Sequence, residues 1–568
     1  MGHTENARVQ IQKMFVSLRF CVRLVIVIGL GGAVCGGVHA APHVKVGVIR
    51  WDCYVGDKHS VGLECERILS GIPLTNQTAA AITNFHFRVP WFGKILPDNK
   101  VEARNTDILT VEREIRYAKA AGIDYWATVW YGDQNDKGLS LQRNLWTQSL
   151  QRNAVQWCHA FDGNFRGAVG DWTTPKQKQL IRDMVALDFK SDMYLKTDSG
   201  RPVVYIIWAD PSYTHCVNAL YAECAEQGVP EPFVVMMSYE TNRERIQNVL
   251  ETCRASAISS YAQCDGKDDL PFAQNATNER NRWALWKTFD TLAIPSVTMG
   301  WDNRIRYYTG CSWYEDINTL KNAWIQYPTA DEIEAHTRDA LQFVLANESA
   351  SDFKSILIYA WNENDEGGFI APTLFELQDP ANKGRPVKLD AINRAIYPFR
   401  VSYTDLDRHP AAPEIRQLAS SSVFIGLPAD TFGPDEIVTV REYTAWLVRT
   451  FGLYADVSKV PLKANDPFAR DLAIAKALDI SIRPRFYLSR TPFTRDRETA
   501  LLLSAITSSE VVTLTAKVLK LLKMSETDAD VQRIFNAIPE RRMTRAKAAV
   551  MLARCLELPF NPNKEPSK

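Results

Sequence analysis

Short apolar runs recur eight times between Val44 and Glu363, and this alternation constrains the fold more than any other feature of the chain. The runs are rich in β-branched and aromatic residues, and stretches with helical periodicity separate most of them. Thr110–Ala121, Gln177–Phe189 and Thr329–Ala346 show this periodicity most clearly, and we expect Thr110 to cap the first of them. The expected strands are Val44–Trp51, Asp124–Tyr131, Ala154–Phe161, Val203–Ala209, Phe233–Tyr239, Ala257–Ala262, Pro295–Asp302 and Ser355–Glu363.

This pattern indicates an α/β fold, a (β/α)8 or TIM barrel over residues 41–400, in which parallel strands alternate with helices. An open doubly wound sheet is the alternative that the same alternation allows. The segment Asp52–Asp107 is rich in Asn, Pro and Gly and forms the main insertion. Because it follows the first strand directly, we expect it to lie over the active face of the barrel.

The last expected strand runs into an acidic loop, Trp361–Gly368 (WNENDEGG). Parallel barrels carry their catalytic groups at the carboxyl ends of the strands. Cleavage of a glycosidic bond needs one carboxyl group to protonate the leaving oxygen and another to supply or assist the nucleophile. We therefore predict Glu363 and Glu366 as catalytic residues, and we expect burial and neighbouring acids to raise the pKa of Glu363. A solvated acidic loop that caps the next helix is the alternative.

A second polar segment, Gly300–Arg306 (GWDNRIR), ends the preceding strand. Trp301 could stack on a sugar ring, Asp302 could accept hydrogen bonds from vicinal hydroxyls, and Arg306 could orient a carboxylate by a bidentate pair. A structural ion pair at the barrel rim is the alternative. Further substrate-binding candidates at strand ends, each of which could instead be structural, are Asp52, Trp130, Tyr131, His159, Asp162, Tyr239, Tyr261, Trp361 and Asn362.

Composition and motifs exclude several classes of function. The formal net charge is zero, which gives no electrostatic footprint for nucleic acid. There is no phosphate-binding glycine loop, no GxSxG nucleophile elbow, no HExxH and no Cys/His spacing typical of zinc. We therefore expect no cofactor, no metal and no nucleic-acid partner. The many aromatic residues at strand ends suit a carbohydrate partner instead.

The N-terminus has the pattern of a targeting segment. Four basic residues precede the apolar run Leu24–Val34, and Val38–Ala40 fits a small-x-small cleavage site. We expect residues 1–40 to be a signal peptide cleaved after Ala40, and the protein to be secreted or at the cell surface. An uncleaved anchor is the alternative, and no other run is long and apolar enough to cross a bilayer.

Nine cysteines remain beyond the signal segment, an odd number. A secreted chain permits disulfides. Close pairs that could form them are Cys53/Cys65, Cys216/Cys224 and Cys253/Cys264, although the connectivity does not follow from the sequence.

The character of the chain changes near Val401. Residues 401–413 contain two prolines and are predicted to be a linker, residues 414–558 to form three degenerate helical repeats, and residues 559–568 to be a disordered tail. Thr439, Thr494 and Thr544 are expected to begin equivalent helices, at spacings of 55 and 50 residues.

The barrel resembles the WbsX-like glycosyltransferase family, which is related to glycoside hydrolase family 99. The residues that carry the resemblance are Arg113–Tyr131, Asp192–Ile206, Gly300–Arg306 and Ala360–Pro372. The resemblance implies an endo-acting α-mannosidase in which Glu363 deprotonates the sugar 2-hydroxyl for internal attack and Glu366 protonates the leaving oxygen. The two residues between the glutamates are usually aromatic and His or Ala in that family, whereas here they are Asn364 and Asp365.

The C-terminal segments resemble S-layer homology domains, whose repeats carry a Thr-Arg-Ala-Glu motif at the start of a helix. The corresponding segments are Thr439–Glu442, Thr494–Arg497 and Thr544–Lys547. This second resemblance implies that the repeats could bind a cell-wall polysaccharide.

The sequence as a whole predicts a secreted, retaining glycoside hydrolase that acts on a polysaccharide or glycan. A WbsX-like glycosyltransferase and a non-catalytic carbohydrate-binding envelope protein are the alternatives.

Overall fold

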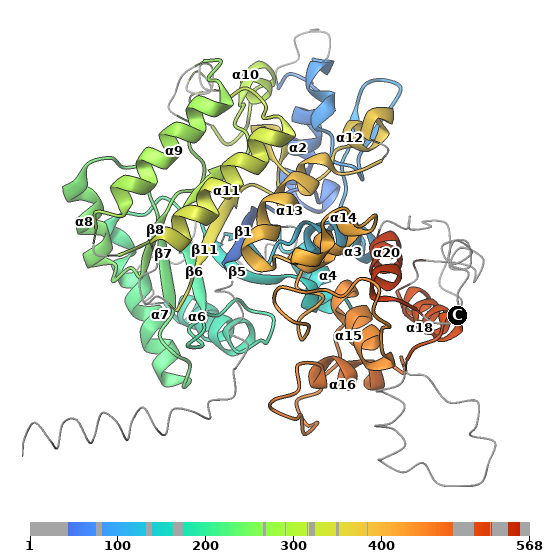
Figure 1. Ribbon diagram of the computed structural model, residues 1–568. Coiled ribbons are helices and arrows are strands. Elements are labelled where there is room, and N and C mark those ends of the chain that lie inside the picture. Colours follow the sequence, from blue (N-terminus) through green and yellow to red (C-terminus); the bar gives the residue numbers. More distant parts are fainter. Residues whose placement is uncertain are drawn as a thin grey trace, which may run out of the picture. The chain divides into compact units, whose positions relative to one another are not determined.

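The structure is a computed structural model and describes residues 44–556, apart from 75–81, 132–138, 163–173, 265–267, 290, 315, 317, 319–323, 348–351, 383, 481–504, 523 and 525–542. All described residues belong to one compact unit, which begins at residue 43. Figure 1 traces its elements from β1, in blue, to α20, in red. The expected signal peptide and C-terminal tail lie outside the described residues.

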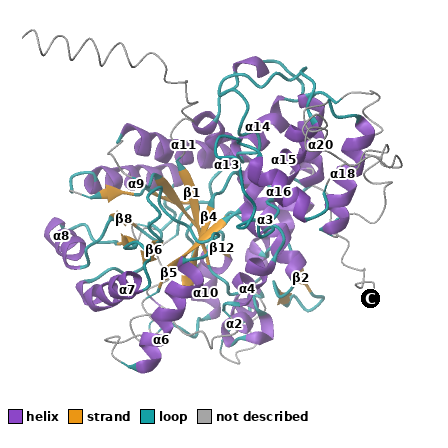
Figure 2. Ribbon diagram, turned by 90° about the horizontal axis from the view of Figure 1, so that it is seen from below, coloured by secondary structure: helices purple, strands orange, loops and turns teal. Residues whose placement is uncertain are grey.

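A curled sheet of nine parallel strands forms the centre of this unit, with helices around it (Figure 2). The strands follow one another around the sheet in sequence order, apart from the pair of strands at its start, β10 and β11. All but β9 lie inside the predicted runs. The strands are β1 (Lys45–Arg50), β4 (Tyr125–Trp130), β5 (Gln156–Phe161), β6 (Val203–Ile206), β7 (Phe233–Met237), β8 (Ala257–Ser259), β9 (Leu292–Ala293), β10 (Ser296–Thr298) and β11 (Ser355–Tyr359).

The two edges of this sheet meet at one short segment, because only Ile294 and Pro295 separate β9 from β10. The Ile294 amide donates to Ile258 O on β8 (2.9 Å), whereas Pro295 O accepts from the Leu357 amide on β11 (3.0 Å). Proline has no N–H to donate, which explains why the strand is interrupted there. This arrangement is consistent with a TIM-like barrel and not with a doubly wound sheet, whose strand order reverses at the middle.

The inside of the sheet is packed around Tyr125. Its hydroxyl forms hydrogen bonds with the hydroxyls of Tyr205 (2.6 Å) and Ser355 (2.8 Å). These two bonds connect β4 with β6 and β11. A Cβ at Gly47 would lie 2.0 Å from the Tyr125 ring, so glycine is required on β1 for the ring to fit. The centre of the sheet is therefore filled by side chains and leaves room for a ligand only at its ends.

The helices begin where local capping allows. The helix α3 (Ile108–Ala121) starts earlier than expected, because Asp107 and not Thr110 is its N-cap: the Asp107 carboxylate accepts from the Leu109 and Thr110 amides (2.9 and 3.0 Å). Thr329 caps the helix α11 as expected. The other helices that pack around the sheet are α4 (Leu141–Gln148), α6 (Pro175–Asp183), α7 (Thr214–Glu226), α8 (Arg243–Thr252), α9 (Phe272–Trp286), α11 (Ala330–Ala346) and α13 (Val387–Arg400).

The insertion after β1 packs against the segments that follow β10 and β11. It contains the helix α2 (Ser60–Leu69), the 3-10 segment η2 (Thr83–Arg88) and a small hairpin of β2 (Lys94–Ile95) and β3 (Val101–Glu102). Arg88 forms a buried ion pair with Asp302, and Arg88 O accepts a hydrogen bond from the Asn364 side chain (2.7 Å). The insertion thus lies against the carboxyl ends of the strands, as its sequence position suggested.

Three of the C-terminal helices start from a closed ring of backbone hydrogen bonds. The Val438 amide donates to Met543 O (3.0 Å), the Met543 amide to Ile506 O (3.4 Å) and the Ile506 amide to Val438 O (3.0 Å). These three residues are fully buried. The helices that follow them are α15 (Val440–Phe451), α18 (Ser508–Leu521) and α20 (Arg545–Leu556). The remaining described α-helices after residue 401 are α14 (Ala412–Ser420) and α16 (Ala469–Ala477).

The ring places three threonines in equivalent positions. Thr439 and Thr507 both cap their helices through a capping box, and Thr544 directly precedes α20. Thr507 therefore takes the position for which the sequence suggested Thr494, a residue outside the described ones. These threonines are 68 and 37 residues apart, so the helical repeats have unequal lengths. A search for a regular spacing could not detect such a correspondence.

Two further expectations differ from the structure. Tyr403, Leu406 and Ala412 belong to the buried cluster of the C-terminal helices, so residues 401–413 pack into a core instead of linking two bodies. None of the nine described cysteines is in a disulfide. Cys216 and Cys224 are eight residues apart on α7, which separates their Cα atoms by about 12 Å, well beyond the reach of a disulfide.

Candidate active site

The acidic loop after β11 is a tight hairpin. The strand β12 (Asn362–Glu363) pairs with β13 (Gly368–Phe369), and the 3-10 turn η7 (Asn364–Glu366) joins them. Gly367 has φ of 77°, and a Cβ there would lie 2.8–3.0 Å from Tyr327 and Asp302 atoms, so only glycine fits. The turn therefore holds three carboxyl groups in one short, fixed segment.

Glu363 is almost completely buried, with 3% of its surface exposed. The Tyr261 hydroxyl donates a hydrogen bond to its Oε1. Burial raises the pKa of Glu363 well above its ordinary value, and the negative charges of Glu366 and Asp365 raise it further. The structure thus supports the expected direction of the shift, and a carboxyl group with a raised pKa is suited to acid–base chemistry near neutral pH.

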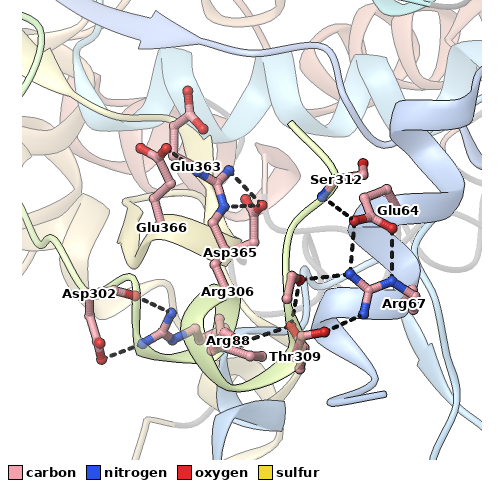
Figure 3. Close-up of polar contacts among 12 residues, drawn as sticks. Glu64, Arg67, Arg88, Asp302, Arg306, Thr309, Ser312, Glu363, Asp365 and Glu366 are labelled. Atoms are coloured by element: carbon pink, nitrogen blue, oxygen red, sulfur yellow. Dashed lines mark hydrogen bonds and ion pairs between the residues drawn. The ribbon is translucent and has the colours of Figure 1, made fainter. Parts of the chain in front are cut away.

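Arg306 connects the other two acids. It lies on the short helix α10 (Arg304–Thr309), and its Nε and Nη2 donate to Asp365 Oδ2 (2.8 and 2.6 Å), while Nη1 donates to Glu366 Oε1. The Tyr359 hydroxyl donates to Glu366 Oε2 (2.5 Å). Figure 3 draws the carboxyl groups of Glu363 and Glu366 next to each other, with Asp365 on the other side of the guanidinium.

The charge of this arginine is strongly stabilised. Burial opposes the charge of Arg306, but Asp365 and Glu366 outweigh burial and hold the pKa of the guanidinium well above its ordinary value. The arginine is therefore a permanent counter-ion inside the site. The sequence suggested that Arg306 would orient an acid, and the structure shows it contacting two.

A cavity of about 560 Å³ opens at these residues. Six of the predicted site residues line it: Tyr131, Asp162, Tyr261, Arg306, Glu363 and Glu366. A space of this size is typical of a site for a small molecule or part of a polymer.

Four aromatic residues in the cavity wall, Trp51, Trp208, Trp313 and Tyr314, were not predicted as site residues, and Trp208 and Trp313 are the most exposed of them. Trp208 and Trp313 line the cavity and expose 55% and 38% of their surfaces. Trp208 has φ of 58°, a left-handed conformation that is costly for a bulky residue and is found mainly at functional sites. It lies two residues after the end of β6, within the predicted run Val203–Ala209, so a tryptophan at a strand end was the signal available in the sequence. Trp313 follows α10, where no sequence pattern marked it.

Several predicted residues lie outside this cavity and support its walls. Asn362 fixes the backbone of Trp51, because its Oδ1 accepts from the Trp51 amide (2.9 Å) and its Nδ2 donates to Trp51 O (2.6 Å). Trp361 is fully buried and donates to Glu114 (2.8 Å). Tyr239 contacts Trp208, with ring centroids 5.0 Å apart.

Two predicted acids are engaged in buried ion pairs. Asp302 is inaccessible to solvent and pairs with both Arg88 and Arg304, which is the structural alternative considered for this segment. Asp52 pairs with Arg50 (2.7 Å) and accepts from the Arg143 amide (3.0 Å).

The remaining candidates pack among aromatic side chains. His159 is fully buried and hydrogen-bonds Asp188 (2.8 Å), and burial lowers its pKa. Trp130 contacts the His159 ring at 5.1 Å. Trp301 contacts Tyr359, whose hydroxyl binds Glu366, so it supports the site indirectly.

In the part of the chain that the structure describes, no three His, Cys, Asp or Glu side chains are grouped to hold a metal ion. No helix among the described residues is both long and apolar enough to span a bilayer.

Comparison with known proteins gave one family match. Residues 402–439 match the S-layer homology domain, and this match includes the segment predicted as a linker and the start of the first predicted repeat. No curated protein matched the chain.

Among solved structures, the GH99 endo-alpha-mannosidase from Bacteroides thetaiotaomicron in complex with BIS-TRIS-Propane is similar to 62% of this chain over 98% of its own length, at 16% identity and a TM-score of 0.40. A second structure of that enzyme covers 58% of this chain and 87% of its own, at 16% identity and a TM-score of 0.37. The family match at residues 402–439, unlike these structural matches, indicates a location: an S-layer homology domain is typical of a cell-surface or S-layer-associated protein.

Proposed function

We propose that this chain is a secreted glycoside hydrolase that cleaves a polysaccharide or glycan with Glu363 and Glu366. One observation carries the proposal: two glutamates of a single hairpin face the same cavity, next to a buried arginine and exposed tryptophans. Paired carboxyl groups with different surroundings are what glycosidic cleavage requires.

The chemistry follows the roles that the family resemblance suggests. Glu363 removes the proton of the sugar 2-hydroxyl, whose oxygen attacks the anomeric carbon of the same ring. Glu366 gives its proton to the leaving oxygen as the glycosidic bond breaks. Water then opens the cyclic intermediate: Glu366 takes a proton from the water, and Glu363 returns its proton to the 2-oxygen. Two successive attacks on the anomeric carbon retain its configuration.

The number of protons on the pair matches this scheme, but their starting position does not. The reaction starts with one proton on the two carboxyl groups, and the raised pKa of Glu363 supports the presence of such a proton before substrate binds. Substrate binding would have to shift that proton to Glu366. Tyr261 and Arg306 each donate to one member of the pair and hold it in place.

The aromatic walls suit sugar rings. Trp208 and Trp313 present large apolar faces to the cavity, against which the C–H face of a sugar can pack. Mannose-containing glycans are the first substrates to test, because the family resemblance points to endo-α-mannosidases.

The test is to incubate the purified chain with a panel of mannans and bacterial polysaccharides and to analyse the products. We expect Glu363→Gln and Glu366→Gln each to lower the rate by about 10²–10⁴-fold while the folded structure is kept. Glu64→Gln is the matched control, because Glu64 pairs with Arg67 on α2, outside the cavity. Hydrolysis by both Gln variants at the parental rate would exclude the proposed mechanism.

The same panel separates the alternatives. Binding of a polysaccharide without product release would favour a carbohydrate-binding envelope protein. Sugar transfer from a nucleotide-sugar donor, together with an uncleaved N-terminus that faces the cytoplasm, would favour a glycosyltransferase. A mature N-terminus at Ala41 would support secretion.

The C-terminal helices are proposed to attach the enzyme to a cell-wall polysaccharide. The S-layer homology match supports this proposal. Co-sedimentation of the chain with purified cell walls tests it, and a chain that remains in the supernatant would contradict it.

A further inference from the structure

The paired glutamates lie in a group of charges that do not balance. Glu363, Asp365 and Glu366 are 3%, 0% and 9% exposed, and Arg306 is the one cation that forms ion pairs with these acids among the described residues. If all three acids were ionised, the group would carry three negative charges and one positive charge, a net charge of −2. Burial of such an excess is costly, and a carboxyl group can avoid the cost by keeping a proton.

The other ionisable groups that face Glu363 do not supply a positive charge. They come from five surrounding segments and are phenols and thiols with raised pKa values, which keeps them neutral. These groups are Cys53 and Tyr54 after β1, Cys65 on α2, Tyr131 after β4, Tyr261 after β8 and Tyr359 on β11. His59 and Asp162 also line the cavity.

Asp365 decides how the single cation is shared. Two guanidinium nitrogens of Arg306 donate to its Oδ2, whereas only one donates to Glu366. Asp365 Oδ1 is buried and has no hydrogen-bond partner among the described residues. Asp365 does not line the cavity, so it cannot contact a substrate there.

We propose that Asp365 is a positioning residue that keeps one proton on the pair Glu363/Glu366. It does so by drawing the guanidinium of Arg306 toward itself and by adding a negative charge beside Glu363. This inference rests on the proposed function for its catalytic meaning.

The test measures the proton directly, without substrate. The full chain is labelled with ¹³C at glutamate carboxyl groups, and the Glu363 signal is assigned as the one missing in Glu363→Gln. In the parent we expect Glu363 to titrate well above the ordinary glutamate value of about 4.3. In Asp365→Asn we expect the midpoint to fall by about one pH unit or more, since a neighbouring negative charge is removed.

Two further variants make the result decisive. Arg306→Gln removes the cation and should move the Glu363 midpoint upward, opposite to Asp365→Asn, so it remains informative if Asp365→Asn does not fold. Glu64→Gln removes an acid from a different arginine pair nearby (Figure 3) and should leave the midpoint unchanged. A parental midpoint near the ordinary value, or an unchanged midpoint in Asp365→Asn, would overturn the inference.

The activity measurement separates this inference from the proposed function. If Glu363 acts as the base, the acidic limb of the kcat/KM profile should move to lower pH in Asp365→Asn by the same amount as the titration. A shifted titration in a chain that hydrolyses none of the panel would reject the proposed function and leave the charge arrangement established. If the chain hydrolyses a panel substrate but the Glu363 titration is unshifted in Asp365→Asn, the proposed function stands and the inference about Asp365 is rejected.

Discussion

The carboxyl end of the barrel and the C-terminal helices are stabilised in opposite ways. At the barrel end, Arg88, Asp302, Arg306 and Asp365 are all at most 2% exposed and hold one another by ion pairs. Each of these charges loses its hydration, and the pairing with its neighbours offsets that cost.

The C-terminal helices instead meet at apolar side chains. Val438, Ile506 and Met543 are fully buried at the ring from which the helices start. Their charged pairs lie further out: Arg441 and Asp466 are 25% and 19% exposed. An apolar core stabilises a fold without demanding a specific partner for each group, whereas buried charges are retained where chemistry needs them. The difference supports the proposal that the barrel end is the reactive end of the molecule.

The largest expected effect tests the cost of an unpaired charge at the barrel end. Arg88→Gln leaves the inaccessible Asp302 without its most buried partner, so we expect a loss of about 3–5 kcal/mol in the free energy of unfolding, measured in denaturant. Arg304→Gln removes the more exposed partner of the same acid and should cost less. Equal losses in the two variants would show that burial does not set the strength of these pairs.

The pH dependence of stability gives the second effect. Glu363 binds its proton more tightly in the folded than in the unfolded chain, so its contribution to stability is full below about pH 4.3 and is lost as pH rises through the raised pKa. Glu363→Gln cannot ionise and should gain stability over the parent with rising pH. The gain should be about 1.4 kcal/mol for each pH unit that separates the folded from the unfolded pKa. Unfolding in urea at several pH values measures this difference.

Glu64→Gln provides a control of opposite sign. Burial raises the pKa of Glu64, but the hydrogen bonds from Arg67 and the Ser312 amide outweigh burial and lower it. Glu64 therefore contributes stability above its unfolded pKa and loses that contribution as pH falls. The Glu64→Gln variant should approach the parent at low pH, and a parallel pH response in the two variants would contradict the assignment of charges at the site.

The third effect contrasts two tryptophans. Trp208→Ala removes an exposed face of the cavity, so we expect KM for a polymeric substrate to rise about tenfold, which corresponds to about 1.4 kcal/mol of binding, with Tm unchanged. Trp446 is fully buried among the C-terminal helices, and Trp446→Ala should lower Tm and leave KM unchanged. A lowered Tm in Trp208→Ala would instead assign that side chain a structural role.

The smallest effect is expected at the surface of the C-terminal helices. Arg441→Gln breaks a partly exposed pair with Asp466 and should cost at most about 1 kcal/mol in the free energy of unfolding. The same variant tests attachment, because Arg441 belongs to the segment that resembles the S-layer motif. Cell-wall co-sedimentation that is unchanged in Arg441→Gln would show that this arginine serves the scaffold alone.

The strands were predictable because parallel strands are buried on both faces and read as continuous apolar runs. All described strands of the central sheet except β9 lie within those runs. The strand β9, which lies just before the seventh run, was not predictable, because its separation from β10 depends on which neighbours Ile294 and Pro295 meet on either side. The start of α18 after Thr507 was also missed. The three helices are equivalent only through the backbone hydrogen bonds that join Val438, Ile506 and Met543, which are far apart in the sequence.

The candidate site also contains some residues that the sequence predicted and others that it did not. Glu363 and Glu366 were found from the sequence because they follow a buried strand within a few residues, and the cavity at them supports that choice. Trp313 was missed because the turn that brings it to the cavity has no local signature. An ion pair was considered for Asp302, but the sequence did not show that Asp302 and Asp52 pair with arginines outside the cavity whereas Glu366 lines it.

The sequence alone therefore determined the order of strands and helices and the position of the acid pair, since both depend on residues close together in the chain. The tertiary structure decided which acids face the cavity and how the charge of Arg306 is shared. Arg306 and Asp365 are 59 residues apart, and their pairing, like the burial that raises the pKa of Glu363, exists only after distant segments have packed together. Desolvation and charge pairing are properties of that packing, and they set the chemistry of the site.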